Sequence, residues 1–282
     1  MPGLMQGKRG LVVGVANDHS IAWGIAKMLA EHGAEMAFTY QGEALGKRVK
    51  PLAESVGAKI VMPCDVEDVS TVDAVFDKIK SDWGKMDFLV HAIAFSDKSE
   101  LKGRYADSTR ENFIRTMVIS CYAFTEAAKR AAALMPDGGA MLTLTYNGGD
   151  RAMPNYNVMG VAKAALESSV RYLAVDFGKQ KISVNAISAG PVRTLAGAGI
   201  TDARAMFAFQ QSYSPLGRGI TLEEMGGAGL YLLSDLSSGV TGEIHFVDSG
   251  YNVIAMPHPD ALKDSGQGQF LFALPLVGRA DR

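Results

Sequence analysis

Tyr156 and Lys163 are the residues whose types and spacing point most directly to chemistry. They stand seven positions apart in a segment that is expected to be helical. Seven residues make close to two turns, so both side chains face one side of the helix, with roughly 10 Å of rise between them. A phenol donor and a cation on one face suit a reaction that builds negative charge on a substrate oxygen. Since many helices contain this pair by chance, the surrounding elements must show whether it is functional.

The composition is that of an ordinary globular protein. The chain has 282 residues, of which 48% are hydrophobic and 21% are charged. A net charge of −2 argues against nucleic acid as the main partner, because nucleic acid would favour a basic surface. Two cysteines, Cys64 and Cys121, are too few for a disulfide framework, so we expect a reducing compartment and a cytoplasmic protein. No stretch is long and apolar enough for a membrane span, so no membrane partner is expected.

Apolar runs alternate with helical patterns along most of the chain. Strands are predicted at residues 10–14, 35–40, 59–63, 86–92, 140–145, 182–187 and 243–247. Helices are predicted at residues 21–32, 43–56, 69–83, 110–135, 156–177 and 222–233. This alternation predicts the α/β class, with a single doubly wound (Rossmann-type) domain and a parallel seven-stranded sheet covered by helices on both faces.

The domain is expected to span residues 1–256, and residues 257–282 form a C-terminal tail. Prolines and glycines interrupt the tail before an apolar run at residues 270–277. Two interpretations stay open. The tail is either a poorly ordered extension or an arm that packs on a neighbouring subunit, because such an apolar run is unfavourable in water.

The first predicted strand leads into a long loop framed by Gly14 and Gly24. Such a loop lets backbone N–H groups and the following helix N-terminus approach a pyrophosphate. Ser20 is placed to cap that helix and to touch phosphate, with Ile21 beside it. The spacing differs from the common G-x-G-x-x-G pattern, so a tight turn without a ligand remains the alternative.

Residues after the next strands extend this dinucleotide site. Gln41 stands where an acidic residue would indicate NAD and a nearby arginine would indicate NADP, and the lack of a basic residue directly after it favours NADH. Asp65, with Val66, could accept a hydrogen bond from the adenine amino group, or Asp65 could instead cap the following helix. Ile93 follows the fourth predicted strand and has small neighbours, so the backbone there can come close to the ribose and nicotinamide. His91 is expected to be packed rather than catalytic.

Taken together, these segments resemble the short-chain dehydrogenase/reductase superfamily and, within it, the bacterial NADH-dependent enoyl-[acyl-carrier-protein] reductases. The resemblance covers roughly residues 5–256. It is carried by residues 14–24, Asp65-Val66, residues 91–95, Tyr146, Tyr156-x6-Lys163, residues 183–191, Arg193-Thr194 and residues 234–242. It implies that NADH reduces the trans-2 double bond of enoyl thioesters on acyl carrier protein, the last reductive step of the fatty-acid elongation cycle.

The resemblance also implies roles for the chemical residues. Most of the superfamily reduces ketones with a Tyr-x3-Lys pair, but the residue four positions after Tyr156 is Gly160. In the enoyl reductases, Lys163 would bind the nicotinamide ribose hydroxyls and Tyr156 would donate a hydrogen bond to the thioester oxygen, where enolate charge develops. Tyr146 is expected to act with them from the wall of the substrate pocket. Whether Tyr156 or water protonates the α-carbon stays open.

By the same resemblance, the turn after residues 182–187 holds the nicotinamide amide and the pyrophosphate through Val192 and Thr194. Residues 195–209, which include two glycines and several alanines, would form a lid over the acyl chain. No metal is expected. The candidate substrate-binding residues are Ser96, Tyr146, Tyr156, Met159 and Met206.

The chain departs from the family pattern at two places. Ala94 replaces a common glycine and is expected to tighten the nicotinamide pocket slightly. Arg204 is the one basic residue of positions 201–205, where the family often has a small cluster thought to face the acidic carrier protein. This predicts weaker carrier affinity and a relatively better substrate on coenzyme A.

The family also implies a homotetramer, with the predicted helices at residues 110–135 and 156–177 as plausible interface faces. Two alternatives to an enoyl reductase remain. Gly160 argues against a ketone- or alcohol-reducing short-chain enzyme, because such enzymes have a lysine at this position. A non-catalytic dinucleotide-binding protein is opposed by the intact Tyr156 and Lys163.

Overall fold

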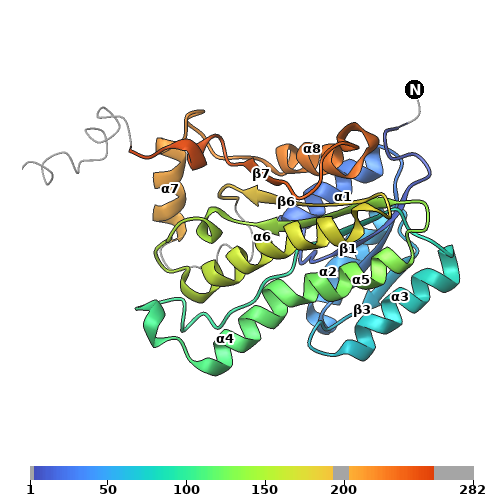
Figure 1. The fold of residues 1–282 in the computed structure, drawn as a ribbon, viewed down its shortest axis with the longest axis horizontal. Helices are drawn as coiled ribbons and strands as arrows, with labels where there is room; N and C mark the ends of the chain where they lie inside the picture. Colours follow the sequence, from blue (N-terminus) through green and yellow to red (C-terminus); the bar gives the residue numbers. More distant parts are fainter. Residues whose placement is uncertain (1–2, 193–202, 257–282) are drawn as a thin grey trace, which may run out of the picture.

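Seven strands form one parallel sheet in the computed structural model, which describes residues 3–192 and 203–256 (Figure 1). The strands are β1 (Arg9–Val13), β2 (Glu35–Tyr40), β3 (Ile60–Pro63), β4 (Phe88–His91), β5 (Gly139–Thr145), β6 (Ile182–Ala189) and β7 (Ile244–Val247). Their order is β3-β2-β1-β4-β5-β6-β7, so the direction of winding reverses between β1 and β4. The predicted doubly wound sheet is confirmed, and its ligand crevice is expected at this reversal.

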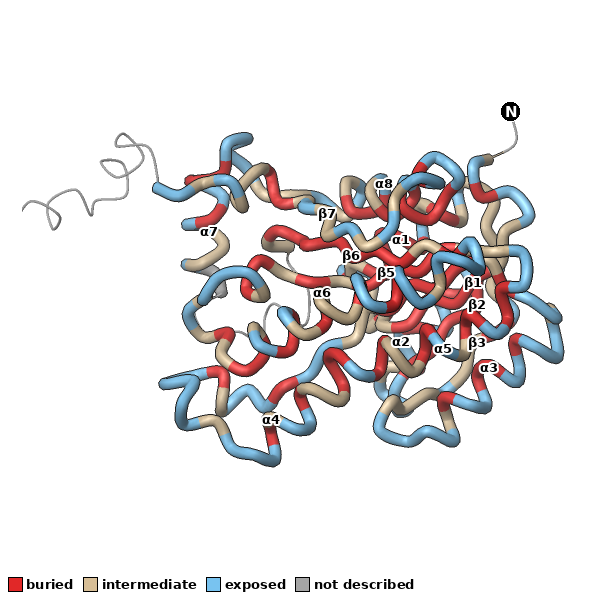
Figure 2. The backbone as a smooth tube through the Cα atoms, viewed as in Figure 1, coloured by how far each residue is buried: buried red, intermediate tan, exposed pale blue. Residues whose placement is uncertain are grey.

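Helices cover both faces of the sheet. One face carries α1 (Ile21–Glu31), α2 (Gly42–Ser55) and α8 (Leu222–Leu233), and the other carries α3 (Val69–Trp83), α5 (Ala123–Ala133) and α6 (Asn157–Gly178). Alternate residues of β1 point into the two cores. Leu11 and Val13 pack on the face that carries α3, α5 and α6, and Val12 packs on the face that carries α1, α2 and α8. The buried backbone follows the strands and the inner sides of the helices (Figure 2). The two hydrophobic cores therefore share one sheet, as a single α/β domain requires.

The helix predicted over residues 110–135 is interrupted by a wider turn. It consists of α4 (Arg110–Met117), a π-helical turn η2 (Val118–Tyr122) and α5. Within η2, the Ser120 hydroxyl accepts a hydrogen bond from Phe95 N at 2.9 Å and donates one to Phe95 O at 3.0 Å. Such π turns occur often at functional sites. Here the turn fixes the loop that follows β4.

Two predicted segments at the periphery lie wholly or partly outside the described residues. The tail at residues 257–282 is one, and residues 195–202 of the expected lid are the other. The remainder of that lid belongs to α7 (Ala203–Tyr213). None of the helices within the described part of the chain is long and apolar enough to cross a membrane.

Glycines allow α1 and α8 to pack closely. A Cβ on Gly226 would lie 2.8 Å from Gly24 O and 2.9 Å from Met28 Cβ. A Cβ on Gly24 would lie 2.7 Å from Leu222 O. Because the contact at Gly24 is in the first turn of α1, it fixes the end of the helix that follows the Gly14 loop.

We therefore expect Gly226→Ala to lower the free energy of unfolding by about 1–3 kcal/mol, because the new methyl group must push the two helices apart. Gly227→Ala is the matched control, since Gly227 lies on the same helix and a Cβ there meets nothing within 4 Å. It should be neutral or stabilising by up to about 1 kcal/mol through helix propensity. Urea unfolding followed by circular dichroism measures both, and equal effects would contradict the packing argument.

Candidate active site

The predicted cofactor residues gather along the carboxyl edge of the sheet. In register, Val13 of β1 lies opposite His91 of β4, and Tyr40 of β2 lies opposite Pro63 of β3. The residues just beyond these ends include Gly14 after β1, Gln41 after β2, Asp65 and Val66 after β3, Ile93 after β4, Tyr146 after β5 and Val192 after β6. Parallel strands all end at the same edge, so residues from distant parts of the sequence lie along one edge of the sheet, where doubly wound folds bind their ligands.

The Gly14 loop approaches the end of β4 too closely for any side chain. Gly14 has φ +107°, and a Cβ there would lie 2.2 Å from Ala92 O. Ser20 precedes α1, but its hydroxyl accepts from the backbone N–H groups of Ala16 at 3.0 Å and Asn17 at 3.1 Å. The prediction that its side chain caps the helix is therefore wrong, because the hydroxyl folds back onto the loop.

The N-terminus of α1 has backbone N–H groups without partners among the described residues. The first N–H groups of α1 that bond back along the described backbone are those of Trp23 and Gly24, both to Ser20 O. This leaves the N–H groups of Ile21 and Ala22 at the free end of the helix, where an anion is favoured. The first turn also contains no acidic side chain that would repel a pyrophosphate. The loop and helix end thus fit a dinucleotide.

Gln41 and Asp65 form a pair at the neighbouring strand ends. Gln41 Nε2 donates to Asp65 Oδ2 at 3.0 Å, and the other carboxylate oxygen of Asp65 accepts from Glu67 N at 3.0 Å. Asp68, and not Asp65, caps α3 by accepting from Ser70 N at 3.0 Å. The alternative that Asp65 merely caps this helix is therefore wrong, and Asp65 remains a candidate for adenine recognition.

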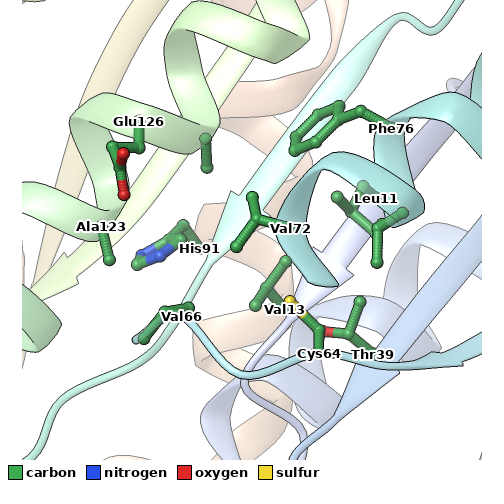
Figure 3. Close-up of a pocket in the computed structure, with 12 residues that line it drawn as sticks. Leu11, Val13, Thr39, Cys64, Val66, Val72, Phe76, His91, Ala123 and Glu126 are labelled. Carbon is green, nitrogen blue, oxygen red and sulfur yellow. The ribbon is translucent and has the colours of Figure 1, made fainter. Parts of the chain in front are cut away.

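His91 lies inside the protein, below the crevice. Its ring packs against Phe124 with centroids 5.6 Å apart, and its Nε2 has no hydrogen-bond partner in the described structure. Burial lowers the pKa of His91 to about 3, and the charge of Lys163 acts in the same direction. The ring borders a cavity of about 20 Å³ among Val66, Ala123 and Glu126 (Figure 3). That volume suits one water molecule and not a substrate, and His91 is packed as predicted.

Tyr146 and Tyr156, two of the predicted catalytic residues, pack against each other. Their rings meet edge to face, with centroids 5.0 Å apart and an interplanar angle of 70°. Tyr156 is buried and immediately precedes α6, and Tyr146 precedes the short turn η3 (Asn147–Gly149). A Cβ on Gly160 would lie 2.7 Å from Gly148 O, and one on Gly148 would lie 2.4 Å from the Tyr156 ring. Gly160 thus has a packing role besides replacing the lysine of the ketone-reducing pattern, because the absence of a side chain lets η3 lie directly on α6.

Lys163 is buried one turn beyond Gly160. Its Nζ donates to Leu144 O at 2.7 Å, at the end of β5. Burial lowers the pKa of the amine to about 8, although Cys121 and Glu167 oppose this shift. Burial raises the pKa of Tyr156 well above its usual value, and Tyr146 and Glu167 reinforce the shift. Tyr156 therefore keeps its proton, and no described residue pairs with its hydroxyl, which is free to donate to a ligand.

Two polar residues beside Tyr146, Tyr156 and Lys163 were not predicted from the sequence. Glu167 Oε1 accepts from Thr145 Oγ1 at 2.6 Å and ties the end of β5 to α6. Its position four residues after Lys163 on one helix was an available signal. Gln210 Nε2 donates to the Tyr146 hydroxyl at 2.6 Å, and it lies one position beyond the expected lid. No sequence pattern marks Gln210.

The predicted substrate residues have different surroundings. Met159 is buried and packs with Tyr156 and Leu101. The Ser96 hydroxyl accepts from Thr116 Oγ1 at 3.0 Å and from Asn112 Nδ2 at 3.2 Å, so it is held inside the protein. Met206 is half-buried on α7 and Val192 is half-buried after β6. Thr194 lies outside the described residues. Within the described part of the chain, no cluster of His, Cys, Asp and Glu side chains could hold a metal.

The buried Lys163 gives a testable pH dependence. Its pKa is about 8 in the folded protein against 10.5 for an ordinary lysine, so the unfolded chain binds more protons between these values. Relative to Lys163→Met, the free energy of unfolding of the wild type should therefore rise with pH across this window, by on the order of 3 kcal/mol. Urea unfolding at intervals from pH 7 to 10.5 measures the difference. Parallel curves for the two proteins would show that Lys163 is not desolvated.

Comparisons with known proteins agree with this geometry. The family model described as enoyl-(acyl carrier protein) reductase matches residues 14–252. An enoyl-[acyl-carrier-protein] reductase [NADH] 2 of Rhizobium meliloti is 72% identical over 93% of this chain and 98% of its own length. An enoyl-[acyl-carrier-protein] reductase [NADH] of Rickettsia typhi is 55% identical over 89% of this chain and 96% of its own length.

Solved structures agree as well. The crystal structure of FabI from Candidatus Liberibacter asiaticus has a TM-score of 0.89 and 59% identity, and covers 92% of this chain and 100% of its own. The reductase of Anaplasma phagocytophilum in complex with NAD has a TM-score of 0.88 and 56% identity, and covers 92% of this chain and 98% of its own. By these relatives and by its sheet, this chain belongs to the enoyl-[acyl-carrier-protein] reductase family of short-chain dehydrogenase/reductase fold.

Proposed function

We propose that this protein reduces the trans-2 double bond of enoyl thioesters carried on acyl carrier protein, with NADH as the reductant, in the last reductive step of fatty-acid elongation. The observation that carries the proposal is Tyr156, packed on the Tyr146 ring: its hydroxyl keeps its proton and has no partner among the described residues, while the buried Lys163 is bound to Leu144 O. A phenol that keeps its proton is a donor for an oxygen that becomes negative. It is poorly suited to give the proton away.

Different residues would bind different parts of the cofactor. The N–H groups of Ile21 and the Gly14 loop would hold the pyrophosphate, with Ser20 beside them, and Asp65 with Val66 would hold the adenine. Lys163 would donate to the nicotinamide ribose hydroxyls. Gln41, Ile93, Val192 and Thr194 complete the proposed cofactor site. When bound, the nicotinamide supplies a hydride to the β-carbon of the substrate.

Tyr156 would then act on the other end of the conjugated system. As the β-carbon gains electrons, negative charge moves to the thioester oxygen, and a fixed O–H donor aimed there is worth most in the transition state. Tyr146 would form the adjoining wall and contribute a second hydroxyl. Met159 and Met206 would contact the acyl chain, with Ser96 at the border of the pocket. The proton for the α-carbon has no assigned donor among the described residues.

The carrier is the proposed partner, and the sequence of α7 bears on its affinity. Arg204 is the one basic residue at positions 201–205. A sparse basic surface attracts an acidic carrier weakly and mainly reduces the rate of association. Thioesters on coenzyme A should accordingly be used better, relative to the carrier, than by reductases with a full cluster.

We further propose a homotetramer that works in the cytoplasm. Large apolar side chains are exposed along α4, η2 and α6, on the helices expected to form interfaces. They are Ile114, Tyr122, Val161, Tyr172 and Val175. Several large exposed apolar side chains on neighbouring helices are more typical of a face covered by another subunit than of one in water.

Assays of the purified protein test the reaction. NADH absorbance should fall rapidly with a trans-2-enoyl thioester on carrier protein and on coenzyme A, and slowly with NADPH or with a β-ketoacyl thioester. Activity confined to the β-keto substrate would move the protein to the ketone-reducing branch and make the Tyr-x6-Lys spacing a coincidence.

Two variants separate the proposed roles. Lys163→Ala should raise the KM for NADH sharply, since it loses contacts to the bound cofactor in ground and transition states alike. Tyr156→Phe should lower kcat by about 10²-fold or more while leaving the KM for NADH nearly unchanged, since it loses one transition-state donor. If both variants lost only NADH affinity, the role given to Tyr156 would be wrong.

Sedimentation velocity tests the assembly. The wild type should sediment as four 30.0 kDa chains. Val175→Glu should give smaller species, because it places a charge on a 79% exposed apolar position of α6. Val253→Glu is the control at a 71% exposed valine outside these helices and should leave the mass unchanged. A monomeric wild type would refute the tetramer.

A further inference from the structure

Gln210 connects α7 directly to the tyrosine pair. Its Nε2 donates to the Tyr146 hydroxyl at 2.6 Å, between residues 64 positions apart in the sequence. The side chain is only 2% exposed, whereas the next residue of the helix, Gln211, is exposed. One of two adjacent glutamines is therefore turned into the protein, and its one described side-chain partner is Tyr146.

The bond determines what the Tyr146 hydroxyl can do. An oxygen that accepts from Gln210 still carries its own hydrogen, and no described residue accepts that hydrogen. Burial raises the pKa of Tyr146, so the hydroxyl stays protonated. The ring is fixed edge to face on Tyr156, and the hydroxyl is fixed by Gln210 at the other end. Tyr146 is thus held as an oriented donor next to the Tyr156 ring.

Stability does not explain a glutamine at this position. Among the described residues, Gln210 Oε1 is buried without a hydrogen-bond partner. Burying a carboxamide with one unpaired oxygen is unfavourable, and an apolar side chain of similar shape would pack there without that penalty. A residue that weakens the fold and bonds to a site tyrosine is expected to be present for the reaction.

We propose that Gln210 is a positioning residue that fixes the Tyr146 hydroxyl and directs its O–H toward the substrate thioester. This inference rests on the proposed enoyl reduction. Because Gln210 belongs to α7, the placement of this helix and the orientation of Tyr146 depend on each other. The helix that borders the acyl chain therefore also helps to assemble the donors for the thioester oxygen.

A double-mutant cycle tests the proposal with Gln210→Met, Tyr146→Phe and the combined variant. Methionine keeps the length and volume of glutamine but removes the N–H donor. We expect Gln210→Met to lower kcat for the enoyl thioester about fivefold to tenfold, the worth of one oriented neutral hydrogen bond, without changing the KM for NADH. The combined variant should lie within about twofold of Tyr146→Phe alone, because the glutamine acts only through that hydroxyl.

Thermal unfolding separates a positioning role from a packing role, because only the loss of a packing role would lower the melting temperature. Gln210→Met should melt at the same temperature as the wild type or higher, and Gln211→Met, on the exposed side of α7, should match the wild type in activity. Multiplicative losses in the combined variant, or a loss of activity that follows a lower melting temperature, would overturn the proposal. An inactive wild type would instead refute the proposed function, so the two failures are distinguishable.

Discussion

The direct contact of the η3 turn with the start of α6 is the constraint on which the chemical site depends. Gly148 and Gly160 leave no room for side chains between the two segments. The contact sets the edge-to-face geometry of Tyr146 and Tyr156 and brings the end of β5 within reach of Lys163. A longer side chain at position 160, such as the lysine of the ketone-reducing pattern, would meet the backbone of η3. The shift from x3 to x6 spacing is therefore a consequence of packing as well as of chemistry.

Burial then acts in opposite directions on the two chemical groups. It raises the pKa of Tyr156, because the phenolate would be desolvated, and it lowers the pKa of Lys163, because the ammonium would be desolvated. A lysine next to the tyrosine would favour the phenolate and promote proton transfer. Here Lys163 is bound to Leu144 O instead, and Tyr156 is left as a hydrogen-bond donor. This arrangement suits a substrate oxygen whose developing negative charge must be stabilised by a hydrogen bond and not neutralised by a proton.

Several buried polar atoms around the site lack partners in the described structure. His91 Nε2, both side-chain polar atoms of Asn147 and Gln210 Oε1 are among them. Most buried polar groups in folded proteins are paired, so unpaired ones carry a stability cost. The unpaired atoms of Asn147 and Gln210 lie next to the two tyrosines, so this part of the described structure is not arranged for maximum stability. The apolar cores on the two faces of the sheet supply the compensating stability.

The alternation of strands and helices, the Gly14 loop and the Tyr156–Lys163 pair could be predicted from the sequence alone, because periodicity and glycine placement are local properties. The sequence also predicted Tyr156 inside a helix and a capping role for Ser20, and it left Asp65 open between two roles. The folded structure was needed for these three points, since they depend on which donors and acceptors the fold brings near each residue. The partners of Glu167 and Gln210 also became known only from the folded structure, because they are distant in sequence. Hydrogen bonds between separate elements depend on packing and produce no local sequence pattern.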